Sequence, residues 1–135
     1  MNIQELSVGD WVLYDKGTIP YSIRSVYRTG IQDCVELNDS KYPEGVIAFV
    51  DRLQPIPITV EILEKNGLEF IDDGNDAVIF LCSDMFWARL CVGDCFWSIG
   101  IHSEDRTDAV ICNVKSVHQL QHVLRLAGVG KEIEL

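Results

Sequence analysis

Short runs of apolar and β-branched residues, each closed by a turn rich in Gly, Asp or Asn, recur along most of the chain. This pattern is typical of short antiparallel strands and restricts the chain to a β-rich fold. The first run, Trp11-Val12-Leu13-Tyr14, alternates after a Gly9-Asp10 turn, and runs at residues 21–27, 33–37 and 46–50 follow. Strands at this spacing predict a small SH3-like β-barrel over residues 1–57.

Two prolines mark a joint in the chain. Pro55 and Pro57 lack backbone N–H groups, so the stretch that they bracket cannot supply a full hydrogen-bonding ladder. We therefore place a boundary between two subregions near Pro57. The length of 135 residues is typical of one compact domain, and we expect both subregions to belong to it.

The second subregion, residues 58–135, begins with a helix signal and returns to a strand pattern. Thr59 can cap a short helix that runs to Asn66, and Gly67 can end it in the left-handed conformation. Strand patterns then occupy residues 68–71, 77–82, 86–92, 95–101 and 109–114. Turn residues at 72–76 and a Gly93-Asp94 pair predict hairpins, and therefore an antiparallel sheet.

A second helix is predicted near the C-terminus, over residues 117–127. Ser116 and Gln119 have the spacing of a capping box, and the apolar residues that follow lie on one face. We expect this helix to pack on the sheet, and residues 132–135 to add an edge strand. The predicted fold class is α+β, mainly β.

Charge restricts the kinds of partner. The formal net charge is −10, with 8 acidic against 5 basic residues in 1–57 and 13 against 6 in 58–135. Such a field repels phosphate backbones, because nucleic-acid affinity depends on Lys and Arg displacing counterions. We therefore expect no direct nucleic-acid binding. An acidic decoy that mimics nucleic acid and occupies a basic protein groove stays open as an alternative.

The sequence predicts a cytoplasmic protein without a membrane segment. Its longest apolar stretches, such as residues 77–82, are far shorter than the roughly 20 residues that span a bilayer as a helix. The N-terminus lacks a basic region followed by an apolar run, as a secretory signal would have. The cysteines lie mostly in apolar runs, and we expect them to be reduced, buried thiols: Cys34, Cys82, Cys91, Cys95 and Cys112.

One set of residues has the composition of a zinc site. Cys91 and Cys95, together with His118 and His122, form a Cys2His2 ligand inventory. Against this reading, the cysteines straddle a predicted apolar hairpin, and the histidines also fit a polar stripe on the helix. We therefore assign no metal, cofactor or catalytic residue, and keep zinc binding by these four residues as an alternative.

Other chemical signatures are missing from the sequence. It contains no dinucleotide-binding or phosphate-loop glycine motif, no nucleophile elbow and no His-Glu-x-x-His. The acidic turn at 72–76 lacks the spacing of a calcium loop. The aromatic pairs Phe86-Trp87 and Phe96-Trp97 must point to opposite faces of a sheet, and any exposed member would favour a protein interface or self-association.

Two stretches carry a resemblance to known proteins. Residues 55–67 (PIPITVEILEKNG) and 117–122 (VHQLQH), the latter leading to 131–135, resemble small phage- and mobile-element-associated proteins of gut bacteria. With the opening at residues 6–12, the resemblance touches both ends and the middle of the chain. The group has no assigned activity, so the resemblance implies no site residue. In that group the position of His122 is often asparagine, which argues against zinc.

Together these observations favour a non-enzymatic accessory protein that acts by binding another protein. The competing hypotheses are a zinc-binding protein or small enzyme that uses Cys91, Cys95, His118 and His122, and the acidic decoy. The sequence alone favours a protein partner without identifying it, and a homo-oligomer stays open as a further possibility.

Overall fold

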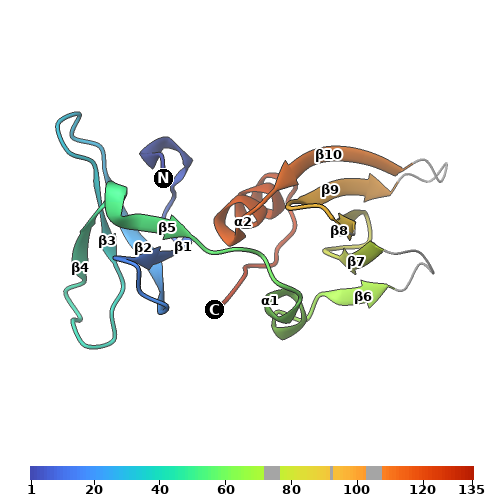
Figure 1. The fold of residues 1–135 in the computed structure, drawn as a ribbon, viewed down its shortest axis with the longest axis horizontal. Helices are drawn as coiled ribbons and strands as arrows, with labels where there is room; N and C mark the ends of the chain where they lie inside the picture. The colour runs from blue at the N-terminus through green and yellow to red at the C-terminus, as the bar shows by residue number, and fades with distance from the viewer. Residues whose placement is uncertain (72–76, 92, 103–107) are drawn as a thin grey trace. The chain divides into compact units, whose positions relative to one another are not determined.

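The computed structural model describes residues 1–71, 77–91, 93–102 and 108–135. The chain divides into two compact units, Met1–Ile56 with Leu135, and Pro57–Glu134 (Figure 1). The division falls beside Pro57, where the two prolines interrupt the sequence pattern. Whether the units form one domain stays a prediction.

The first unit is built on a single antiparallel sheet. Its strands are β1 (Trp11–Tyr14), β2 (Pro20–Tyr27), β3 (Cys34–Leu37), β4 (Val46–Phe49) and β5 (Leu53–Pro55), in the order β4-β3-β2-β1-β5. Two 3-10 turns, η1 (Ile3–Glu5) and η2 (Val50–Arg52), precede β1 and β5. β1 to β4 confirm the segments that the sequence pattern predicts, whereas β5, which pairs with β1 up to Pro55, was not predicted.

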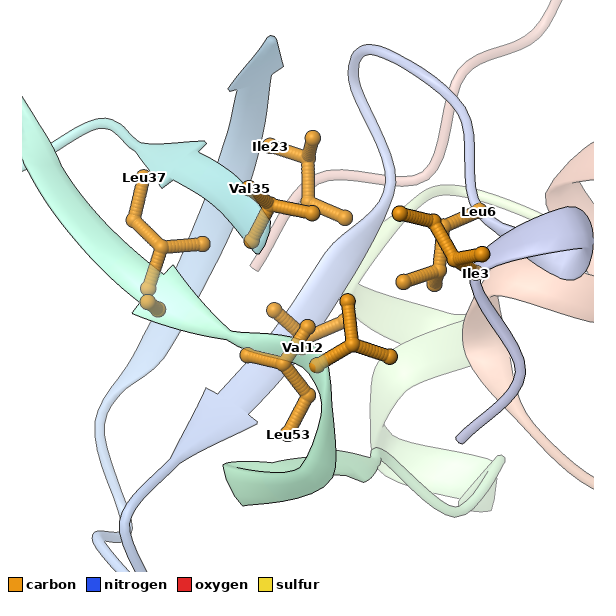
Figure 2. Packing of buried hydrophobic residues seen from close by; sticks show 9 residues of the cluster. Ile3, Leu6, Val12, Ile23, Val35, Leu37 and Leu53 are labelled. Carbon is orange, nitrogen blue, oxygen red and sulfur yellow. The ribbon is translucent and has the colours of Figure 1, made fainter. Parts of the chain in front are cut away.

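The core of the first unit comes from one face of this sheet and from the N-terminal segment. Val12, Val35 and Leu37 are completely buried, and Ile3 and Leu6 pack with them (Figure 2). Apolar residues at alternate strand positions reach the same face because the side-chain period of a strand is two. The burial of this one face explains why apolar residues recur at alternate positions of these strands in the sequence.

The SH3-like barrel predicted for residues 1–57 is not confirmed. The sheet is open, with β4 at one edge and β5 at the other. A register shift in β2 between Ile23 and Ser25 bends the sheet locally, as a bulge does, without joining its edges. Strand spacing and turn residues in the sequence indicate how many strands form. They do not indicate whether the two edge strands, here β4 and β5, pair with each other and close a barrel.

Among its described residues, the second unit contains a five-stranded antiparallel sheet and two helices. Its strands are β6 (Glu69–Ile71), β7 (Ala77–Leu81), β8 (Phe86–Cys91), β9 (Trp97–His102) and β10 (Asp108–Val114), in the order β10-β9-β8-β7-β6. The antiparallel sheet and the α+β, mainly β class are confirmed. β9 begins at Trp97, so Cys95 lies outside the strand that was predicted to include it.

Aromatic side chains fill much of this unit. The Phe80 ring lies with its centroid 5.6 Å from that of Phe70 and 6.2 Å from that of Trp97. The indole N–H of Trp97 donates to the Ile58 carbonyl at 3.3 Å. On the neighbouring strand Trp87 lies directly opposite Gly100, where a Cβ atom would approach its ring to 2.1 Å.

The helices confirm one predicted cap and correct another. Thr59 caps α1 (Val60–Lys65), since its hydroxyl accepts from the Ile62 N–H at 3.3 Å. Ser116 precedes α2 (Val117–Leu126) without a side-chain capping bond. Its Oγ lies 3.0 Å from Nδ1 of His118, and Gln119 Oε1 accepts from Lys115 N–H at 2.9 Å. The helix therefore forms as predicted, but the predicted capping box is wrong, because Ser116 and Gln119 bond to groups other than those that a capping box requires.

The C-terminal segment is held by side chains and does not form the predicted edge strand. Ile133 is 1% exposed, and Arg125 forms an ion pair with Glu132 at 2.9 Å. Asn66 contacts both backbone polar groups of Glu134. These contacts supply the partners that a strand ladder would have supplied.

Candidate functional site

Two rows of side chains share the solvent-facing side of β2, β3 and β4. The register places Tyr27 opposite Cys34 and Cys34 opposite Phe49. The next row along the strands is formed in the same way by Ser25, Glu36 and Ile47. We call this surface the outer face; its members are Ser25, Tyr27, Cys34, Glu36, Ile47 and Phe49.

Three of the six side chains on the outer face are large, apolar or aromatic, and exposed to solvent. Ile47 is 55% exposed, Tyr27 42% and Phe49 39%. The intervening positions Val35 and Ala48 point to the core and are completely buried. Both faces of β4 carry apolar side chains. Ala48 is buried on the core face, whereas Ile47 and Phe49 remain in contact with water on the outer face. Clustered exposed apolar and aromatic groups are typical of protein interfaces.

A polar network fixes the middle of the outer face. The Tyr27 hydroxyl donates to Glu36 Oε2 at 3.0 Å, and Arg24 forms an ion pair with Glu36 at 3.3 Å. Arg24 also donates to the carbonyl of Pro43 at 3.1 Å. The Arg24 charge offsets that of the carboxylate, and the hydrogen bond limits rotation of the Tyr27 ring. The network thus keeps an aromatic side chain ordered without adding net charge to the surface.

Gly45, just before β4, allows the Glu36 side chain its position. Gly45 has a φ of +88°, and a Cβ there would lie 2.7 Å from Glu36 Oε1. Glycine adopts this φ without steric cost and leaves room for the carboxylate. The loop that leads into β4 is therefore shaped around the outer face.

β4 is also an edge strand, and its backbone is available for pairing. The N–H of Val50 donates to the carbonyl of Asp33 at 3.2 Å, on the β3 side. Because successive residues of an antiparallel strand point their polar groups to opposite sides, those of Ile47 and Phe49 point away from β3. The same residues expose apolar side chains on the outer face. Charged side chains and proline usually prevent an edge strand from pairing with another chain, and the segment Val46–Phe49 contains neither.

The four residues of the zinc alternative lie in different elements of the second unit. Cys91 ends β8, and Cys95 is exposed before β9. His118 is buried on α2 and His122 is one turn further along, with ring centroids 6.1 Å apart. Across the described residues, no three His, Cys, Asp or Glu side chains gather as a metal site would require. The structure therefore gives the zinc hypothesis no support.

The cysteines are free thiols in different environments. All five lie within the described residues, and none is paired in a disulfide. Burial raises the pKa of Cys82 to about 11, against a smaller opposing effect of Lys131. Burial also raises the pKa of Cys112. The expectation of buried thiols holds only for Cys82, because Cys95 is exposed and the other three are half-buried: Cys34, Cys91 and Cys112.

Several other sequence features give no site. The acidic turn at 72–76 lies outside the described residues. The pairs Phe86-Trp87 and Phe96-Trp97 do not supply the exposed patch, because both tryptophans are buried and the phenylalanines are half-buried. Within the part of the chain that the structure describes, no helix is long and apolar enough to cross a membrane.

Sequence reasoning missed the outer face. The available signal was the run Val46-Ile47-Ala48-Phe49-Val50, in which both alternating sets are apolar. Such a run also fits a strand that is buried on both sides. No family model matches the chain. Comparisons with curated proteins and with solved structures likewise found no match. Function is therefore inferred from the geometry of the outer face.

Proposed function

We propose that this chain is a non-enzymatic protein-interaction module that binds its partner through the outer face. The observation that carries the proposal is the exposure of Tyr27 on β2 and of Ile47 and Phe49 on β4, on the same face of the sheet and on either side of β3. Leaving these groups in water is unfavourable, and covering them with another protein removes that cost. The resemblance to phage- and mobile-element-associated proteins suggests the setting, that of a small accessory protein.

The arrangement favours binding over catalysis. Glu36 is engaged by both Tyr27 and Arg24, so the central carboxylate acts as a structural group. Aromatic side chains contribute large contact areas with few rotatable bonds and are enriched at interface centres. Glu36 and Tyr27 are already held in place by their mutual hydrogen bond, so less side-chain freedom is lost when a partner binds.

The test is site-specific photo-crosslinking. A photoreactive amino acid at position 49 is compared with the same residue at position 70, since Phe70 is an exposed phenylalanine of the other sheet. We expect a discrete adduct from position 49 that disappears in the Tyr27→Ser/Ile47→Ser variant, and no such adduct from position 70. Equal adduct patterns from the two positions would contradict an interface on the outer face.

A second measurement addresses the non-enzymatic part of the proposal. Purified protein is incubated with a broad panel of hydrolase substrates, and the Tyr27→Ser/Ile47→Ser variant serves as the matched control. We expect no turnover by either protein. Turnover by the wild-type chain would show that the protein is an enzyme.

A further inference from the structure

We infer that β4 pairs antiparallel with β4 of a second copy of this chain across the sheet edge, so that the outer faces of the two copies form one continuous surface. This inference rests on the proposed function and names a second copy as the partner at the β4 side of the outer face. The structural basis is that Ile47 and Phe49 each combine an outward-directed backbone with an exposed apolar side chain.

The register of β4 makes the strand complementary to itself. A two-fold axis perpendicular to the sheet and midway between the Ala48 residues of the two copies brings Ile47 of each copy opposite Phe49 of the other. Both residues of each pair direct their N–H and C=O groups toward the partner strand, so each pair exchanges backbone hydrogen bonds. Ala48 then faces its own equivalent at a position where neither residue directs polar groups across. No other register centred on this four-residue strand pairs both outward residues with each other.

The side chains agree with this register. On the outer face each pair sets an aromatic ring against a β-branched side chain, a combination that stabilises antiparallel sheets. The row Tyr27, Cys34 and Phe49 then continues into the row Ile47, Glu36 and Ser25 of the second copy. Closed two-fold pairing removes both exposed β4 edges and stops at a dimer. A four-residue strand gives a small interface, so the dimer is weak.

Association is measured first, by sedimentation equilibrium of the full chain from micromolar to millimolar concentration. We expect a reversible monomer–dimer equilibrium. Ile47→Pro removes an N–H that points away from β3 and should weaken dimerisation about tenfold or more, while the ladder to β3 is kept. Amide exchange at Val50, whose N–H bonds to Asp33, reports whether that ladder persists.

Ile47→Thr keeps the backbone N–H and removes apolar side-chain area, so dimerisation should also weaken. Threonine is favoured in strands, so β4 itself should still form. Val110→Thr is the matched control, because Val110 is a 60% exposed residue of the edge strand β10. Its dimerisation should equal that of the wild type. Equal loss in both threonine variants would overturn the assignment to β4.

The register is tested by disulfide trapping in a Cys34→Ser/Cys95→Ser background. A mixture of Ile47→Cys and Phe49→Cys chains should cross-link faster than either chain alone, since opposite residues of a hydrogen-bonded pair are about 5.5 Å apart at Cα, within reach of a disulfide. A chain that stays monomeric at millimolar concentration overturns the inference. If position 49 still gives a discrete adduct with a different protein, the proposed interface stands while self-pairing falls.

Discussion

Asn66 and Glu134 form a side-chain-to-backbone pair that imitates a strand ladder across 68 residues of sequence. Asn66 Oδ1 accepts from the N–H of Glu134 at 2.7 Å, and its Nδ2 donates to the Glu134 carbonyl at 2.9 Å. The same Nδ2 lies 2.9 Å from the carbonyl of Ile62 in α1. One amide thus joins the end of a helix to the C-terminal segment.

Replacement of Asn66 should release this segment. We expect Asn66→Ala to lower the free energy of unfolding by about 1–3 kcal/mol, because two hydrogen bonds to the segment are lost. Hydrogen exchange at the Glu134 amide should accelerate at the same time. Asn66→Asp keeps the acceptor but sets a carboxylate oxygen against the carbonyls of Ile62 and Glu134, so it should destabilise the segment at least as much. Unchanged exchange at Glu134 in the alanine variant would show that the segment is held by other contacts.

Gly100 is required by the ring of Trp87. A Cβ at position 100 would lie 2.1–2.5 Å from the indole carbons, so Gly100→Ala must displace the ring or the strand. We expect a loss of about 1–3 kcal/mol in thermal or urea unfolding, with altered tryptophan fluorescence. Gly130→Ala, where no atom lies within 4 Å of the added Cβ, is the matched control. Trp87→Leu should partly rescue Gly100→Ala, and failure to do so would place the strain elsewhere.

The turn after β1 holds two adjacent non-glycine residues in the left-handed region. Asp15 has a φ of 53° and Lys16 a φ of 60°, a conformation that costs an L-residue with a Cβ about 1–2 kcal/mol. Lys16→Gly should raise the free energy of unfolding by about 0.5 kcal/mol, once the greater freedom of glycine in the unfolded chain is counted. Lys16→Ala removes the same charge and keeps the strain, so it should bring no gain. Equal stabilisation by both variants would assign the effect to charge.

The raised pKa of Cys82 predicts a stability change at alkaline pH. The folded thiol keeps its proton up to about pH 11, whereas the unfolded thiol loses it near 9.0. The folded state therefore binds more protons between these values, and stability is lost as pH rises through that window. The loss should reach about 2 kcal/mol near pH 11. Urea unfolding of Cys82→Ala should lack this component, and identical pH profiles for the two proteins would refute it.

Metal content separates the interaction module from the zinc alternative. Cys91, Cys95, His118 and His122 do not gather in groups of three, so we expect far less than one zinc per chain in protein purified without a metal-affinity column. Elemental mass spectrometry is the measurement. A thiol-reactive probe used alongside should label exposed Cys95 rapidly and buried Cys82 only after unfolding. Stoichiometric zinc with a protected Cys95 would revive the alternative.

Local features of the sequence were sufficient for most of the elements. Thr59 caps α1 because the hydroxyl and the Ile62 N–H are only three residues apart, so the contact forms within the helix end itself. Strands such as Trp11–Tyr14 follow from alternation, since a period of two sorts side chains onto two faces whatever their neighbours are. These rules need no knowledge of the rest of the chain.

The tertiary structure decided the features that depend on distant or competing partners. Ser116 had the correct spacing for a cap, yet its hydroxyl lies against His118, a competing partner that the spacing rule does not include. The run at 46–50 identified a strand, but only the strand order placed it at an edge and left Ile47 and Phe49 in water. Alternation states that a residue faces one side of a sheet. Whether anything covers that side is set by segments far away in the sequence, and the candidate site could therefore be found only in three dimensions.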